Sequence, residues 1–321
     1  MSWRVASALA SPGGRRGRLS VLFLHRVLPS HDPLLPDEPT PELFESMLLW
    51  VKSQFAVLPL SEALDRLDNH ELPAGAASLT FDDGYLDNLE VAAPLLQSHG
   101  LSATFFVATD FMDGGLMWND RVIESIRRTA VGTLALPQFG LPPLAVDSLQ
   151  QRRAAVVTLL DALKYMPFSE RLAAVVAVER ACGVDQHPAL MMNTGHVRRL
   201  ASAGFEIGAH TCSHPILTQL PDAQAEQEIA GSRARLQAIL NAEVPLFAYP
   251  NGREGKDFDM RHREMARRAG FTAAFTTEPG VSHHTSDRWR LPRFTPWSRR
   301  PLPFRLQLLR NQLQRSGHRM P

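Results

Sequence analysis

Short apolar runs recur along the chain, and segments with helical periodicity separate them. The runs are SVLFLH at 20–25, SLTF at 78–81, ATFFVA at 103–108, FEIGAH at 205–210, PLFAYP at 245–250 and FTAAFT at 271–276. They are mostly apolar throughout, with little polar alternation, which is typical of strands buried on both faces of a parallel sheet. The pattern therefore predicts a central sheet with both faces covered.

The segments between these runs predict helices. Thr40 and Pro41 are typical of a helix start, and one face of the following segment is formed by Leu43, Phe44, Met47, Leu48 and Val51. Residues 224–240 and 259–270 repeat the pattern, and the second segment ends at Gly270, a residue favoured at helix ends. Strands that alternate with helices predict an α/β fold, and six or more such units favour a closed barrel.

One region interrupts this alternation. Residues 117–200 contain three helical patterns and an irregular segment, which predict a mostly helical insertion between two barrel strands. The expected organisation is a basic N-terminal tail over 1–19, a main domain over 20–300 and a C-terminal amphipathic helix or tail over 301–321.

Composition narrows the classes of function. The chain has 321 residues and a net charge of +1, so charge gives no argument for a nucleic-acid partner. Two cysteines do not make a disulfide framework. No apolar run approaches the ~18 residues of a membrane span, and no signal peptide is recognised. These features predict a cytoplasmic protein by default, with the bacterial periplasm or cell surface left open and the oligomeric state undetermined.

Ionisable residues follow several of the predicted strands. His25 follows the first run, Asp82 and Asp83 follow the second, and His210 with His214 follows the fourth. In an α/β barrel, the loops after the strands form the active face. We therefore expect these side chains to meet at one end of the barrel.

Two histidines four residues apart, together with a carboxylate, are typical of a metal site. Two imidazoles and one carboxylate leave positions open on a dication, as in catalytic sites. One of the paired aspartates would bind the ion, and the other would stay ionised and accept a proton from the attacking water. The alternative is that Asp82 and Asp83 only cap the following helix. Trp118 is either a packing residue or an aromatic face for a sugar.

Three motifs carry a resemblance to a known family. TFDDG, HTCSH and FAYPNG, in this order, resemble the polysaccharide deacetylases with a NodB-homology domain, carbohydrate esterase family 4. The resemblance implies a distorted (β/α)7 barrel and metal-dependent hydrolysis of N-acetyl groups in amino-sugar polymers or oligosaccharides. It implies one divalent ion, zinc with cobalt or nickel as alternatives. Matched to the motifs, the residues are Asp82 as base, Asp83, His210 and His214 as metal ligands, and the Asn251 amide as oxyanion donor beside Tyr249 and Pro250.

The chain also departs from the family pattern. Ala248 stands where the family carries an arginine that orients the base, and Arg293 in LPRF is a candidate replacement. No Leu-x-His motif, which supplies the general acid in many members, follows residue 285. The opening LFLHRV resembles the subgroup that deacetylates poly-N-acetylglucosamine-type exopolysaccharides, where the acid comes from the first strand. That resemblance implies His25 as the general acid, and MWNDRV resembles deacetylases of exopolysaccharide pathways.

Two other functions remain open at this level. The same barrel could hydrolyse a cyclic or other non-sugar amide. A barrel without the motif arginine could also bind carbohydrate without catalysis.

Overall fold

The computed structural model describes residues 2–296 and 298–314. Its centre is a seven-stranded sheet in the order β1-β3-β4-β7-β8-β9, with β2 paired to β3. All of these pairings are parallel. The strands are β1 (Ser20–Leu24), β2 (Ala56–Val57), β3 (Ala76–Phe81), β4 (Thr104–Val107), β7 (Glu206–Ala209), β8 (Leu246–Ala248) and β9 (Ala273–Phe275).

The segment after β9 connects the two edges of this sheet. Leu291 forms a parallel bridge with Phe275 of β9, and Phe294 forms one with Leu22 of β1. These single bridges join the first and last strands of the sheet, where a regular barrel would have a full strand. The distorted parallel barrel expected from the sequence is thereby confirmed, and the closing segment carries Arg293 between the first and last strands.

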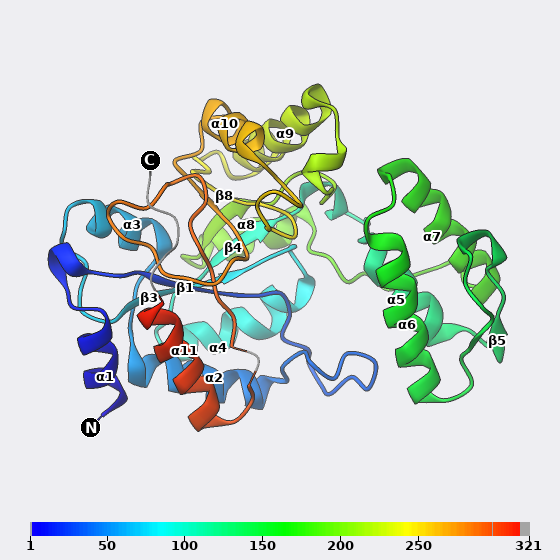
Figure 1. The fold of residues 1–321 in the computed structure, drawn as a ribbon, viewed down its shortest axis with the longest axis horizontal. Helices are drawn as coiled ribbons and strands as arrows, with labels where there is room; N and C mark the ends of the chain where they lie inside the picture. The colour runs from blue at the N-terminus through cyan, green and yellow to red at the C-terminus, as the bar shows by residue number, and fades with distance from the viewer. Residues whose placement is uncertain (1, 297, 315–321) are drawn as a thin grey trace.

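Helices cover the outside of the barrel (Figure 1). They are α2 (Pro41–Gln54), α3 (Leu60–Asp68), α4 (Ala93–Ser98), α8 (Thr194–Ser202), α9 (Asp222–Leu240) and α10 (Met260–Arg268). All six residues of β3 are buried, because helices cover the sheet outside and side chains fill it inside. Burial on both faces of the sheet explains why the strand runs in the sequence are apolar throughout.

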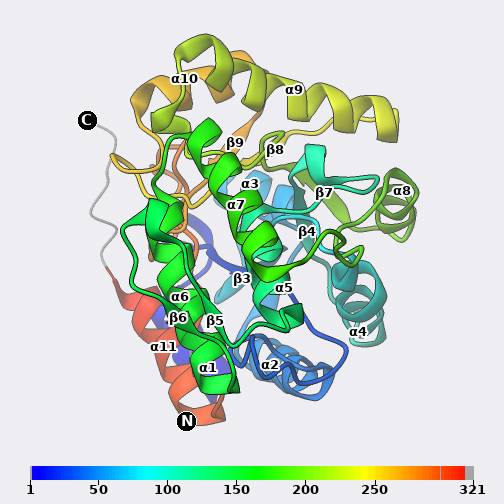
Figure 2. The same ribbon diagram turned by 90° about the vertical axis from the view of Figure 1, so that its right-hand side faces the viewer.

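The helical insertion packs as a separate unit beside the barrel in Figure 1, and it faces the viewer in Figure 2. It contains α5 (Trp118–Arg128), the hairpin β5 (Thr133–Leu134) and β6 (Leu144–Ala145), α6 (Leu149–Lys164) and α7 (Phe168–Cys182). Its apolar residues form their own cluster. By contrast, Val197 and Leu200 of α8 belong to the barrel core. We therefore place the end of the insertion near residue 182, earlier than the expected 200.

Both ends of the described chain are helical and lie together. Residues expected as an N-terminal tail contain α1 (Trp3–Ala10), which contacts α2 and α11 (Pro301–Leu313). Residues 315–321 of the expected C-terminal segment lie outside the described residues. Within the described ranges, no helix has both the length and the apolar character needed to cross a bilayer. Cys182 and Cys212 are free thiols.

Candidate active site

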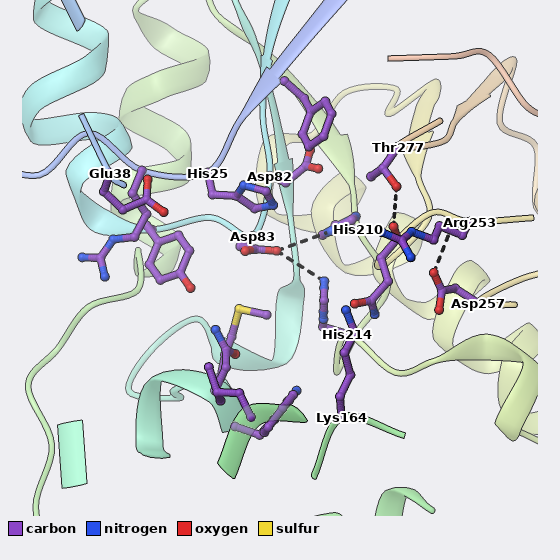
Figure 3. A pocket seen from close by; sticks show the side chains of 18 of the residues that line it. His25, Glu38, Asp82, Asp83, Lys164, His210, His214, Arg253, Asp257 and Thr277 are labelled. Atoms are coloured by element: carbon purple, nitrogen blue, oxygen red, sulfur yellow. Dashed lines mark hydrogen bonds and ion pairs between the residues drawn. The ribbon is translucent and has the colours of Figure 1, made fainter. Parts of the chain in front are cut away.

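The polar residues that follow the strands meet around one cavity of about 590 Å³ (Figure 3). His25 comes from the end of β1, Asp82 and Asp83 from the end of β3, and His210 with His214 from the end of β7. Parallel strands point their carboxyl ends to one side of the barrel, so residues distant in sequence share this mouth. The structure thus brings the expected catalytic and metal-binding residues together.

The backbone at this cavity is held in unusual conformations. Asp83, Thr211, His214 and Asn251 are four of the seven described non-glycine residues with positive φ. Gly84 also has a positive φ of 89°, and a Cβ there would lie 3.0 Å from the Val107 side chain. Such conformations are disfavoured for residues with side chains and cluster at functional sites. The glycine after the two aspartates is therefore required by the sharp turn that presents them.

Asp83, His210 and His214 form a group with metal-ligand geometry. The Nε2 atoms of both histidines lie 3.4 Å from Oδ1 of Asp83. Nδ1 of His210 lies 2.7 Å from the carbonyl of Ala248, which fixes the proton on Nδ1 and leaves Nε2 free to bind a cation. Oδ1 of Asp83 is buried without a hydrogen-bond partner among the described residues. A buried, unpartnered carboxylate oxygen facing two imidazole nitrogens fits a divalent ion.

Burial and neighbouring charges shift the pKa values of these three groups in different directions. Burial lowers the pKa of His214 to about 3, so its imidazole is neutral at neutral pH. Burial alone would raise the pKa of the Asp83 carboxyl, but the close contact with the His210 imidazole and the nearby His214 hold it well below its usual range. Asp83 in turn raises the pKa of His210 against the effect of burial. A dication binds an ionised carboxylate and neutral imidazoles, so a bound metal would take the place of the proton that Asp83 favours on His210.

Asp82 is fully enclosed and paired with Arg293. Nη1 and Nη2 of the guanidinium donate to the two carboxylate oxygens, each at 2.7 Å. Burial would raise the pKa of Asp82, but the charge of Arg293 outweighs it, with help from His210, and holds this pKa below its usual range. Arg293 is itself held by the Thr276 carbonyl and lies over the Phe23 ring. The arginine that is missing at Ala248 thus has a counterpart in the barrel-closing segment.

His25 lies at the solvent side of the cavity. Its side chain is exposed, and no described residue forms a hydrogen bond with its imidazole. Figure 3 shows the ring above Asp83 and beside Glu38, which sequence reasoning missed. Burial raises the pKa of the Glu38 carboxyl, and His25 partly offsets this effect. A free imidazole at the mouth of the site is able to exchange a proton with a bound molecule.

The motif after β8 contributes one residue of the three expected. Asn251 lines the cavity, and no described residue accepts a hydrogen bond from its backbone N–H. Tyr249 is a correction: its ring is buried and stacks on Phe258, with centroids 3.8 Å apart, and its hydroxyl donates to the Trp289 carbonyl. Tyr249 therefore packs in the core. Pro250 is buried and does not line the cavity.

The insertion supplies the opposite wall of the cavity. Trp118, at the start of α5, lines it, and Arg171 covers the indole at 5.1 Å from the ring centroid. Lys164, at the end of α6, extends its side chain toward His214 (Figure 3). The structure places Trp118 at the cavity, and its contact with a sugar stays a prediction. Lys164 was not singled out because nothing in its sequence surroundings links it to the strand ends.

A second buried network beside the cavity was also missed. The Tyr85 hydroxyl donates to Asp120 at 2.9 Å, and the Arg26 guanidinium lies 4.4 Å from the Tyr85 ring centroid. Arg26 also pairs with Asp87 at 2.8 Å. Burial raises the pKa of the Asp120 carboxyl to about 7. Asp120 belongs to MWNDRV, so the signal was present in the sequence, but its partners come from other parts of the fold.

Comparison with known proteins places this geometry in a family. The family model described as polysaccharide deacetylase matches residues 69–131 and 168–274. YxkH of Bacillus subtilis, whose name assigns it to the polysaccharide deacetylases, is 20% identical over 278 residues, which cover 86% of this chain and 70% of that protein. The gap in the family match falls within the helical insertion.

Solved structures share the fold. The Streptococcus pyogenes deacetylase PplD, in complex with acetate, has a TM-score of 0.61 and 19% identity, covering 92% of this chain and 98% of that one. IcaB from Ammonifex degensii has a TM-score of 0.58 and 19% identity, covering 95% and 99%. Structural similarity at 19% identity supports a shared fold alone. The chemistry of this chain is therefore inferred from its own residues.

Proposed function

This chain belongs to the polysaccharide deacetylase family, and from that premise we propose that it is a metal-dependent hydrolase of N-acetyl groups on amino-sugar polymers or oligosaccharides. The observation that carries the proposal is the position of Asp83 Oδ1, 3.4 Å from two imidazole Nε2 atoms and next in sequence to a carboxylate held by an arginine. This arrangement joins a cation site to a base.

Asp83, His210 and His214 would hold one divalent ion, for which zinc, cobalt and nickel are the candidates. When bound, such an ion supplies Lewis-acid polarisation of the acetyl carbonyl and lowers the pKa of water. The tautomer of His210 is already set by the Ala248 carbonyl, so the ligand set needs little rearrangement.

Asp82 is the proposed general base. Its carboxylate is kept ionised by Arg293, which also fixes its orientation through two hydrogen bonds. It can therefore take the proton of the attacking water. The open backbone N–H of Asn251 is placed to donate to the oxygen that gains charge in the transition state.

His25 is the proposed general acid. The amine that leaves from an amide is a poor leaving group unless it is protonated. The exposed, unbonded imidazole of His25 at the same cavity can deliver that proton. Trp118 on the opposite wall would contact a sugar ring, which suits an extended saccharide better than a small amide.

The alternative of a non-catalytic barrel loses its main support. That alternative rested on the absence of an arginine at Ala248, and Arg293 makes the expected kind of contact with Asp82. Acetate is the product that the proposed reaction releases, and the solved structure of PplD is a complex with acetate.

The direct test is acetate release from acetylated chitooligosaccharides and from poly-N-acetylglucosamine oligomers with added Zn²⁺ or Co²⁺. We expect release with at least one saccharide, and release that is about 10²–10⁴-fold slower with the Asp82→Asn variant. Opening of cyclic amides without acetate release would favour the non-sugar hydrolase. Saccharide binding without any hydrolysis would favour the carbohydrate-binding barrel.

A further inference from the structure

Basic residues are concentrated at the two ends of this chain. Residues 1–18 contain four arginines and residues 295–321 contain six, and neither segment contains an aspartate or glutamate. The whole chain has 34 lysines and arginines against 33 acidic residues, so the remainder holds 24 basic residues against 33 acidic ones. The net charge near zero is therefore the sum of a basic excess at the two ends of the chain and an acidic excess in the rest of it.

The fold brings the two basic ends together. α1 contacts α11, and the Arg305 guanidinium lies 5.6 Å from the centroid of the Trp3 ring. Phe304 and Leu308 of α11 are buried in the barrel core, which fixes this helix to the body of the protein. The pair of helices is therefore a firmly attached surface formed from both ends of the sequence.

The outer sides of these helices carry apolar residues. Val5 and Leu9 on α1 and Leu302, Leu306 and Leu313 on α11 are between 48% and 69% exposed. Spacings of four and seven residues place the members on one side of each helix. Arg4, Arg300 and Arg310 are exposed as well, and none of their guanidinium groups forms a hydrogen bond or ion pair with a described residue. We call these eight residues the terminal-helix surface.

Exposed leucines among unpaired arginines, with no acidic residue nearby in sequence, are the features of helices that lie in a membrane interface. The leucines enter the boundary between headgroups and acyl chains, while the arginines pair with lipid phosphates. α1 has 8 residues and α11 has 13, which is too short to span a bilayer but sufficient to lie on one. We propose that the terminal-helix surface docks this protein on an anionic phospholipid membrane.

The position of the surface is compatible with catalysis. Figure 1 shows α1 and α11 at the lower left, below the barrel strands, and α5, α6 and α7 apart from them at the right. The catalytic cavity opens beside those three helices, since Trp118 and Lys164 line it. A molecule docked through α1 and α11 would leave the cavity accessible to a saccharide chain. This inference goes beyond the proposed function and does not depend on it.

Co-sedimentation of the full chain with lipid vesicles tests the inference. Vesicles of phosphatidylcholine with about 30 mol% phosphatidylglycerol should bind the protein at about 0.1 M salt, and binding should fall at about 0.5 M salt. Pure phosphatidylcholine vesicles should bind it far less. Substitution of Arg4, Arg300 and Arg310 by serine should weaken partitioning about fivefold per arginine, and substitution of Leu9, Leu306 and Leu313 by serine should weaken it further.

A matched control carries the same kinds of change elsewhere. Leu172 and Arg180 on α7 are exposed, and the Leu172→Ser/Arg180→Ser variant should bind vesicles as the unaltered protein does. Thermal unfolding verifies that each variant is folded. Equal binding to both vesicle types, or unchanged binding of the terminal variants, would overturn the proposal. So would a dimer in analytical ultracentrifugation that the leucine variant dissociates, if no vesicle binding accompanies it.

Discussion

Arg293 binds both carboxylate oxygens of Asp82 through its two terminal nitrogens, although the two residues are 211 positions apart in sequence. The contact exists because the segment after β9 returns to β1 and closes the barrel. Arg293 is among the largest fully buried side chains, so its charge acts in a medium that screens weakly. The ionised state of Asp82 therefore depends mainly on Arg293, with a smaller contribution from His210.

Removal of this partner should change the pH dependence of the reaction. In Arg293→Met, burial would raise the pKa of Asp82, so the acidic limb of the kcat/KM profile should move to higher pH. Activity should then fall more at pH 6 than at pH 9. Arg293→Lys should shift the limb less, because the charge remains while one hydrogen bond is lost. An acidic limb that stays in place in Arg293→Met would show that Asp82 is not the titrating base.

The same substitution should destabilise the protein. An unpaired buried carboxylate costs about 3–5 kcal/mol, which urea unfolding at pH 7 can measure. Because the folded-state pKa of Asp82 is lowered, the stabilisation is present above pH ~4 and is lost as pH falls below that value. The double variant Asp82→Asn/Arg293→Met should recover part of the loss, and equal destabilisation in single and double variants would contradict this account.

The two adjacent aspartates should respond differently to substitution. Asp82→Asn should retain the metal and lose turnover by about 10²–10⁴-fold, as expected for a lost general base. Asp83→Asn should lose metal affinity first, because Oδ1 of Asp83 faces both imidazoles. Elemental analysis and acetate release separate the two effects. Equal loss of metal in both variants would rule out the division of roles.

Chelation should inactivate the enzyme reversibly. Treatment with a chelator should abolish acetate release, and Zn²⁺ or Co²⁺ should restore it. The metal should also raise the midpoint of thermal unfolding in the unaltered protein and not in His210→Ala or His214→Ala. His31→Ala, an exposed histidine in the loop after β1, serves as the control. Full activity of protein shown to be metal-free would refute the metal site.

His25→Ala should separate two kinds of substrate. Amide substrates need a protonated leaving group, whereas activated aryl acetates do not, so the variant should slow amides far more. Metal content should not change, and the basic limb of the pH–rate profile should disappear if it reports the imidazolium. If both substrates slow equally and that limb persists, His25 has only a structural role.

Asp120 should give the protein an unusual dependence of stability on pH. Burial raises its folded-state pKa to about 7, above the value near 3.9 expected in an unfolded chain. The unfolded state therefore loses this proton first, and the free energy of unfolding should decline from pH ~4 to ~7, by about 1.4 kcal/mol per pKa unit at most. Asp120→Asn keeps an acceptor for Tyr85 and should remove this decline. An identical pH profile in the variant would exclude Asp120 as the cause.

The candidate site residues that lie in sequence motifs could be predicted from the sequence. Asp82, Asp83, His210 and His214 follow apolar strands, and parallel strands must end on one side of a barrel, so their meeting was predictable. The strand runs themselves were predictable because burial on both faces removes the polar alternation, as in β3. Family resemblance also indicated Tyr249, but its position beside Asn251 did not reveal that its side chain points into the core.

The contacts that the sequence left undecided are those between distant segments. Arg293 could be suggested as the partner of Asp82 only because an arginine was missing elsewhere, and the distance between them follows from barrel closure. Glu38 lies in a loop, and Lys164 and Asp120 lie on helices of the insertion. The periodicity of these helices predicts their apolar faces, but not that Lys164 lines the cavity or that Asp120 contacts Tyr85. The sequence by itself determined the parallel α/β architecture and the motif residues that we expect to bind a metal, because periodicity and short spacings are local. Only the tertiary structure decided how Asp82 is held, which insertion residues face the cavity, and that the helices at the two ends of the chain lie together. Chain closure and packing set those distances.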